Sequence, residues 1–424
     1  MARITFSTMY NTTMRHLQLN AAKMDKLAEQ AISEQKINRP SDNPIGFTNV
    51  LRYGNVLNSL GQQRVNMDDG GIYMSVLEAT HDKMNKLFQN SKDLAIQGAN
   101  DPVNHSQRLI INMDVRQNLE LLVSLAQTKH KEGFIFSGKW TNQPPYEIKN
   151  GEAVYYEHKE QTATPPFSDD PPFDYGDAIT IRLLDGNYND PNIPVDSDPD
   201  YINHPVVQRI IPGSVSGLEG LKEKPSFSED GVPDYDYEID YVNGTITLLS
   251  GDAKRAFYDE TTGDPRTDPP NMSFEYIYRN SIDMSGEIYR EIDTGITMKI
   301  NTNPDDLFGK AALTDTDSFK EIIALMQGLW YNDQAQIANG IDTVEAARER
   351  NLKEQAVEGS RLSRLDIVFD RNLGLEETNT KAYSDVMDVE LEEVINQFNM
   401  AKMVYDLSLY TSANVLNRSL MDYL

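Results

Sequence analysis

The 424-residue sequence contains no cysteine. This absence excludes disulfide bonds, thiolate nucleophiles and sulfur-ligated metal sites. The sequence also has no uninterrupted apolar run of the roughly eighteen residues that a membrane-spanning helix needs, and we therefore expect no membrane insertion. Its first residues lack a basic segment followed by an apolar one, so we expect no cleavable secretory signal.

Positive charge is scarce, with 39 Lys and Arg against 66 Asp and Glu and a formal net charge of −27. Because phosphate contacts need clustered Lys and Arg, this balance argues against a nucleic-acid-binding protein. The length allows about two to four domains with sizeable cores. Composition by itself favours an acidic cytosolic protein.

Glycine and proline are both missing from residues 1–39 and 375–424, and apolar or small residues recur there at alternating intervals of three and four. A repeat of about 3.5 residues is typical of helices that wind around a partner helix. We therefore predict that the chain turns back on itself and that its two ends pair as a coiled coil. The predicted assembly seam comprises Tyr10, Met14, Leu17, Ala21, Met24, Ala28, Ala31, Leu391, Val394, Phe398, Ala401, Tyr405 and Val415.

Many of these seam positions are small, including Ala21, Ala28, Ala31 and Ala401. An isolated helix that buries so little apolar surface is marginal in water. The pattern therefore favours ends that order only when neighbouring subunits cover them. The alternative is that the seam is simply part of the protein's own core, as most apolar helix stripes are.

Further helices are expected on both sides of the chain's middle. Asn43 followed by Pro44 is typical of a helix N-cap with proline in the first turn, and helical spacing then continues to Ala99. We expect an interruption of that helix near Gly70 and Gly71. In the second half, we expect helix breaks at Gly340 and just before the terminal helix at Gly374.

The middle of the chain is rich in Pro, Asp, Tyr and Thr and contains short alternating runs typical of strands. The alternation through residues 235–248, with Asn243-Gly244 at its centre, predicts a hairpin with a type I′ turn. The expected fold class is mainly α with an inserted β-rich domain. Its expected domains are the terminal coiled coil (1–40 with 385–424), a helical bundle (41–140 with 301–384) and the acidic β-rich insert (141–300).

No motif supports catalysis or cofactor binding. Residues 133–139 fit the spacing G-x-x-x-x-G-K, but Trp140 follows where a phosphate-binding loop has Ser or Thr. Residues 196–207 begin like a calcium loop, yet Tyr201 and Val207 occupy its glycine and glutamate positions. No two histidines are spaced as zinc ligands. A solvated acidic face is the simpler interpretation of residues 161–200, and a calcium- or glycan-binding insert is the alternative.

Four segments resemble a known family. Residues 31–44, with Arg39, Pro40, Ser41, Asp42 and Pro44, are similar to a turn motif of the flagellin and hook-associated family of bacterial flagellar axial proteins. The segment with Gly133, Phe136 and Gly138 resembles a motif of the hook–filament junction branch of that family. Residues 303–309 and the C-terminal region resemble it as well. Glu34 stands where the family usually has glycine, which suggests that the first helix continues further.

The resemblance implies a structural role without an active site. It implies export through the flagellar type III apparatus with a chaperone, and an extracellular place in the flagellum. The implied partners are the first hook-associated protein, flagellin and further copies of the chain in a ring. A flagellin-like filament subunit and the first hook-associated protein remain alternatives within the family.

Overall fold

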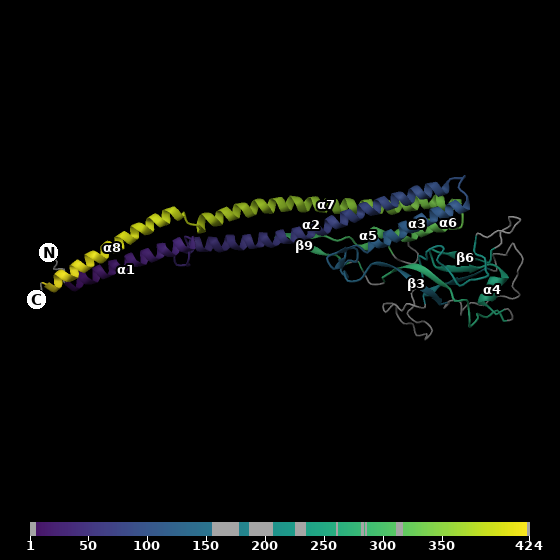
Figure 1. Ribbon diagram of the computed structural model, residues 1–424, viewed down its shortest axis with the longest axis horizontal. Helices are drawn as coiled ribbons and strands as arrows, with labels where there is room; N and C mark the ends of the chain where they lie inside the picture. The colour runs from purple at the N-terminus through teal and green to yellow at the C-terminus, as the bar shows by residue number, and fades with distance from the viewer. Residues whose placement is uncertain are drawn as a thin grey trace. The chain divides into compact units, whose positions relative to one another are not determined.

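The computed structural model describes residues 6–154, 178–185, 207–224, 235–259, 262–280, 284, 286–310 and 317–421. The side chains of residues 6, 7, 9, 154 and 414–421 lie outside this description. The chain is mainly helical, with long terminal helices packed together and small β-sheets in its middle (Figure 1). The expected fold class is therefore confirmed.

The element order is helices, strands, helices. It runs α1 (Phe6–Ser33), α2 (Pro44–Ala99), α3 (His105–Ala126), β1 (Lys129–His130), β2 (Gly133–Phe134), β3 (Tyr146–Val154), β4 (Ile179–Arg182), β5 (Leu184–Asp185), β6 (Tyr237–Asp240), β7 (Thr245–Leu248), α4 (Gly251–Phe257), β8 (Ser273–Arg279), β9 (Tyr289–Asp293), β10 (Ile296–Lys299), α5 (Pro304–Phe308), α6 (Ser318–Trp330), α7 (Gln334–Met387) and α8 (Leu391–Met421).

The chain divides into two compact units. Unit 1 comprises Met1–Met67, Glu291–Ile296 and Asp366–Leu424, and it contains the terminal helices α1 and α8. Unit 2 comprises Asp68–Arg290 and Thr297–Leu365, and it contains strands β1 to β8.

The core of unit 2 is a continuous apolar cluster that joins helices α3 and α6 to the strands. An aromatic group lies at its centre, where Tyr146 packs against Phe319 with ring centroids 4.2 Å apart and against Phe308 at 5.3 Å. Val115, Leu119, Leu122 and Ala126 recur along α3 at intervals of three and four, and all four are fully buried in this core.

Two three-stranded sheets form the β-rich part, in the orders β5-β3-β8 and β4-β7-β6. The predicted hairpin of β6 and β7 is confirmed, but its predicted two-residue turn is wrong. The register pairs Asp240 with Thr245, so residues 241–244 form the loop. The loop is longer because Tyr241 turns into the core, where its side chain is fully buried.

Three predicted helix breaks at glycine are wrong. Helix α2 continues through Gly70 and Gly71, which lie beside the side chains of Ile300 and Leu365. Helix α7 continues through Gly340 and Gly374 and ends only at Met387. A single helix glycine costs about 1 kcal/mol relative to alanine, which tertiary packing readily offsets.

Candidate assembly surface

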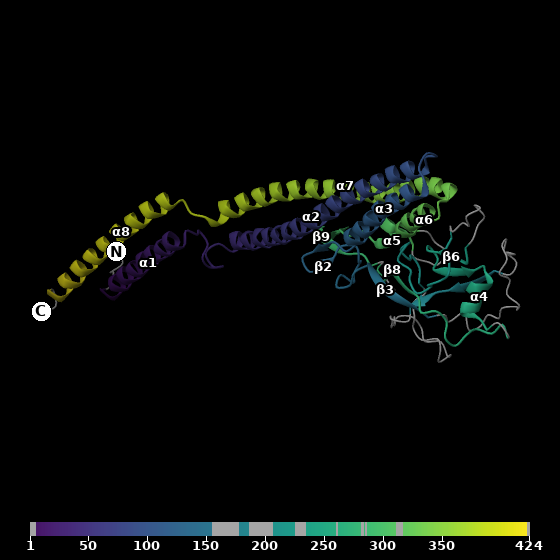
Figure 2. The ribbon, with the colours of Figure 1, turned by 45° about the vertical axis from the view of Figure 1, so that its right-hand side comes forward.

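Helices α1 and α8 pack along each other as an antiparallel pair in unit 1, side by side in Figures 1 and 2. The apolar core of this pair consists of the buried side chains Leu27, Val394 and Ala401, and Met24, Ala31, Val389 and Phe398 pack against them. The structure thus brings together predicted seam residues from both ends of the chain.

The remaining predicted seam residues of α1 are mostly half-buried, as the small size of the seam requires. Met14, Leu17, Ala21 and Ala28 belong to this group. Tyr10 lies near the start of the described chain and is 41% exposed. On α1, the covered face therefore follows the predicted one over most of the helix.

On α8, the covered face follows the predicted three-four spacing. Phe398, Tyr405 and Ser408 are half-buried between the buried positions. Leu391, the first residue of the helix, is 41% exposed. The side chain of Val415 lies outside the described residues.

Two contributors to the seam are missing from the sequence prediction. Leu27 is the most buried described residue of α1, although it lies beside the predicted stripe. Asn20 donates from Nδ2 to Ser408 Oγ over 2.7 Å, which places a polar link inside the seam. A wider apolar face, of the kind that globular helices show, would have included Leu27. A polar residue at a seam position can fix the register of two helices.

The segment after α1 and the connection between α7 and α8 are joined by backbone hydrogen bonds within unit 1. Lys36 N donates to Met387 O over 2.6 Å, and Val389 N donates to Glu34 O over 3.2 Å. The expectation that Glu34 extends the first helix is wrong, because α1 ends at Ser33 and Glu34 has φ = 58°. Glu34 thus adopts the left-handed conformation that glycine adopts without steric cost.

The turn after this joint is held by its own side chains. Asp42 Oδ2 accepts from Arg39 N over 3.0 Å, and Lys26 Nζ lies 3.0 Å from Asp42 Oδ1. The hydrogen bond from Lys26 holds the pKa of the Asp42 carboxyl below its usual value. Pro40 and Ser41 are exposed in this turn. Asn43 Oδ1 accepts from Gly46 N over 2.9 Å, so the predicted N-cap before Pro44 is confirmed.

The outer surface of α8 carries more large apolar side chains than a surface helix needs. We call Met400, Met403, Val404, Leu407 and Tyr410 the methionine flank; these side chains are 50–72% exposed. We call Leu391, Ile395 and Leu409 the leucine flank, whose members are 41–43% exposed. The methionine flank gathers five exposed apolar side chains within Met400–Tyr410, and an exposed apolar patch of this kind is typical of interaction sites.

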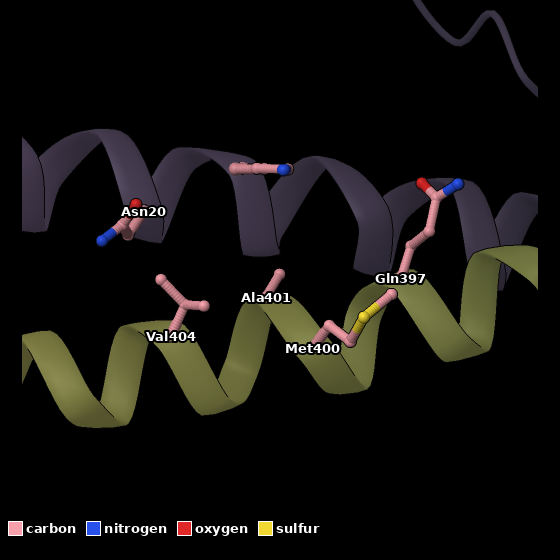
Figure 3. A pocket seen from close by; sticks show the side chains of 6 residues that line it. Asn20, Gln397, Met400, Ala401 and Val404 are labelled. Carbon is pink, nitrogen blue, oxygen red and sulfur yellow. The ribbon is translucent and has the colours of Figure 1, made fainter.

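A depression of about 240 Å³ lies beside the seam, between the two helices (Figure 3). Its lining combines Asn20 and Lys23 of α1 with Gln397, Met400, Ala401 and Val404 of α8. The methionine flank therefore continues into this depression through Met400 and Val404.

The segment from Gly133 to Gly138 lies in unit 2, where its residues pack closely against neighbouring parts of the chain. Phe136 is fully buried between His81 and Phe308, with ring centroids 6.0 and 5.8 Å away. A Cβ atom on Gly138 would lie 2.1 Å from Met284 O, and its φ is 58°. A Cβ atom on Gly133 would lie 2.8 Å from Thr141 Cβ. This segment packs closely against its neighbours and lines no site in the described structure.

The residues that the sequence suggested as calcium ligands form no metal site in the described part of the chain. Within the described ranges, no group of three or more His, Asp or Glu side chains is arranged to hold a metal ion. Asp196–Asp200 lie outside the described residues. Asp185, from the same acidic stretch, is buried and accepts from Tyr276 Oη over 2.7 Å, so it is not part of a solvated face. None of the helices that the structure describes is long and apolar enough to cross a membrane.

Comparison with known proteins identifies the N-terminal part of the chain. Residues 4–141 match the family model for the bacterial flagellin N-terminal helical region. This part of the chain is therefore similar to the N-terminal helical region of bacterial flagellins.

Two curated relatives match parts of the chain. A flagellin from Clostridium tyrobutyricum is 25% identical over 125 residues, which cover 30% of this chain and 33% of the relative. Flagellar hook-associated protein 3 from Escherichia coli (strain K12) is 22% identical over 153 residues, which cover 36% of this chain and 48% of the relative. The chain therefore matches between a third and a half of the length of these relatives.

Solved structures also align with the fold. A flagellar hook-associated protein from Vibrio parahaemolyticus aligns with a TM-score of 0.46 and 12% identity, covering 82% of this chain and all of that one. Bacillus cereus FlgL aligns with a TM-score of 0.38 and 12% identity, covering 77% and 97% of the two chains.

Proposed function

We propose that this chain is a structural subunit of the bacterial flagellum that joins the hook-associated ring to the flagellin filament, as a protein of the hook-associated protein 3 type. The observation that carries the proposal is the α1–α8 pair, whose seam is covered while two apolar flanks stay exposed. The matched flagellin region and the name of the Escherichia coli relative support it.

Assembly through the terminal helices is the proposed mechanism. The seam buries few large side chains, so the pair gains little stability by itself. Neighbouring subunits would cover the exposed flanks and complete the packing. The proposed partners are the first hook-associated protein, flagellin and further copies of this chain, with an export chaperone before secretion. The proposed location is extracellular, at the hook–filament junction.

The position of the protein on the flagellum tests this proposal. In a strain that lacks flagellin, a junction subunit remains at the hook tip, where antibody labelling and electron microscopy can locate it. If the chain is a flagellin-type filament subunit, it forms a filament there, an alternative that the flagellin relative keeps open. If the chain is instead the first hook-associated protein, it binds directly to the hook and needs no junction ring for its attachment. Absence from the flagellum contradicts all three assignments.

Substitutions in the seam test the mechanism. Leu17→Asp or Val394→Asp puts a charge into the covered face, and the protein should stay soluble but fail to attach to the flagellum. Gln18→Asp is the matched control, because Gln18 adjoins Leu17 in the sequence and is exposed. Normal motility of both seam variants would refute the assignment of the seam.

Hydrogen exchange tests how stably the terminal helices are folded before assembly. In the free protein, amides of α1 and α8 should exchange much faster than those of the buried helices α3 and α6. They should gain protection in isolated flagella. Equal protection of all four helices in the free chain would contradict completion by neighbours.

A further inference from the structure

Three asparagines of the chain are each followed by glycine, a pair of residues whose side chain and backbone react readily with each other. The glycine N attacks the asparagine Cγ, so that a new Cγ–N bond forms while the Cγ–Nδ2 bond breaks, and ammonia leaves with the glycine N–H proton. Water then opens the resulting succinimide to aspartate or isoaspartate. Glycine favours this reaction because it has no side chain to hinder the attack. The three pairs are Asn150-Gly151, Asn243-Gly244 and Asn339-Gly340.

The backbone distinguishes the three pairs, whereas solvent access does not, because each asparagine is exposed and each glycine is buried. Asn150 lies in β3 and pairs with Glu275 of β8, and Asn339 lies inside α7. The regular backbone of a strand or a helix fixes ψ and holds the next nitrogen away from the side-chain carbon. Asn243 lies in the loop between β6 and β7, where the backbone is irregular. It is therefore the pair that ring closure can reach with the least rearrangement.

Asp240 holds both reacting groups of the loop pair. Its main-chain O accepts from Gly244 N over 2.8 Å, which engages the attacking nitrogen. Its Oδ2 accepts from Asn243 Nδ2 over 2.7 Å, and its Oδ1 accepts from Asn243 N over 3.1 Å. The carboxylate thus fixes the side-chain amide that has to turn toward Gly244 N. Ring closure in the folded chain therefore has to break charge-assisted hydrogen bonds.

Conversion of Asn243 would prevent the loop from closing again. A carboxylate at this position would face that of Asp240, and like charges at hydrogen-bonding distance repel each other. Isoaspartate would also insert a methylene into the main chain before Gly244, where the packing is tight, since a Cβ atom on Gly244 would lie 1.7 Å from Val207 O. Gly244 O accepts from Leu183 N over 2.9 Å, so the displaced loop would also lose its bond to the segment after β4.

We infer that Asn243 is a latent modification site, which Asp240 protects while the loop is closed and which converts to aspartate or isoaspartate when the loop opens. Water is the co-reactant, and ammonia is the leaving group. Because the product does not fit the closed loop, each conversion leaves a permanent record of an opening. The site and its protection are independent of the proposed function.

Deamidation of the purified full chain tests this inference. The natural chain, Asp240→Ala and the control Asp252→Ala are incubated at mildly alkaline pH, and peptide mapping by mass spectrometry follows each of the three pairs. Asp240→Ala keeps the main-chain acceptor and removes the carboxylate. Conversion at Asn243 should become about tenfold faster, while the other two pairs keep their rates. Asp252 is an exposed carboxylate of α4 that bonds to Arg255, and its removal should change none of the three rates.

Folded and urea-unfolded samples of the natural chain provide a second measurement. In the folded chain, Asn243 should be the fastest of the three pairs, yet at least about tenfold slower than in the unfolded chain. A faster reaction at Asn150 or Asn339 in the folded chain overturns the choice of site, and equal rates at Asn243 in both samples overturn its protection. An unchanged rate in Asp240→Ala overturns the role of Asp240. Equal acceleration of all three pairs does so as well, because it shows that Asp240 maintains the whole fold rather than the loop.

Discussion

At the scale of single residues, Glu34 is the clearest conflict between local preference and fold. Its positive φ costs about 1 kcal/mol relative to glycine. We therefore expect Glu34→Gly to stabilise the joint between α1 and the α7–α8 connection. Amide exchange at Lys36 and Val389, whose N–H groups bond across the joint, should slow by about fivefold.

Gln35→Gly is the matched control for this prediction. Gln35 adjoins Glu34 and pairs with Asp388 across the same joint. Unlike Glu34, it does not have a positive φ. Glycine at this position adds backbone freedom without relieving strain, so exchange at Lys36 and Val389 should become faster. Equal effects of the two substitutions would show that the left-handed conformation of Glu34 does not limit the joint.

His81 provides a second prediction, which concerns pH. It is fully buried, and Nδ1 lies 2.7 Å from Asn351 Oδ1. Burial lowers the pKa of His81 below its ordinary value of 6.5. Because the unfolded chain then binds this proton more tightly, the free energy of unfolding should fall as the pH drops below about 6.5. His81→Gln should flatten this fall between pH 8 and pH 5.5, measured by denaturant titration at each pH. An unchanged slope would contradict the role of His81.

At the scale of elements, helix boundaries were the part that the sequence predicted least well. The predicted seam of α1 and α8 and the repeat of α3 depend on periodicity within one segment of sequence. The structure has helices in these segments. Gly70, Gly71 and Gly340 lie inside helices because the surrounding packing offsets their cost, and that packing depends on distant residues. The joint at Glu34 was missed for the same reason, since its hydrogen-bonding partners are more than 350 positions away in the sequence.

Two glycines of α7 allow a matched test of this explanation. A Cβ atom on Gly340 would lie 2.8 Å from Leu325 Cδ1 and 3.1 Å from Leu325 Cβ, whereas Gly359 has no atom within 4 Å of that position. Gly359→Ala should raise the free energy of unfolding by roughly 0.5–1 kcal/mol through helix propensity. Gly340→Ala should lower it by about 1–3 kcal/mol through overpacking. Thermal unfolding followed by circular dichroism measures both, and a gain in both variants would remove the packing explanation for Gly340.

At the scale of the whole molecule, the site could be predicted only in outline. The sequence located most of the seam because its residues recur at fixed intervals at both ends. It did not show Asn20 pairing with Ser408 or the two exposed flanks of α8, since these depend on which face of each helix its partner covers. Unit 2 also depends on a contact between distant parts of the sequence, because a buried ion pair connects its β-rich part to its helices.

That ion pair joins Arg209 to Asp317, and both side chains are almost fully buried. Asp317 also caps α6, because its Oδ1 accepts from Phe319 N and Lys320 N. Removing one partner of a buried pair leaves an uncompensated charge, which costs about 3–5 kcal/mol. We therefore expect Arg209→Ala to lower the stability of unit 2 by about this amount, with strand and helix signals lost together in denaturant titration.

Arg116→Ala is the control for this last prediction. Arg116 also connects a helix to a strand, through a 2.6 Å contact with Glu275, but its side chain is 33% exposed. Exposed ion pairs contribute about 0–1 kcal/mol, so this variant should unfold close to the natural protein. If both variants lose the same stability, the number of contacts between helices and strands matters more than burial. If Arg209→Ala unfolds the strands while the helices stay folded, the buried pair does not couple the two parts of unit 2.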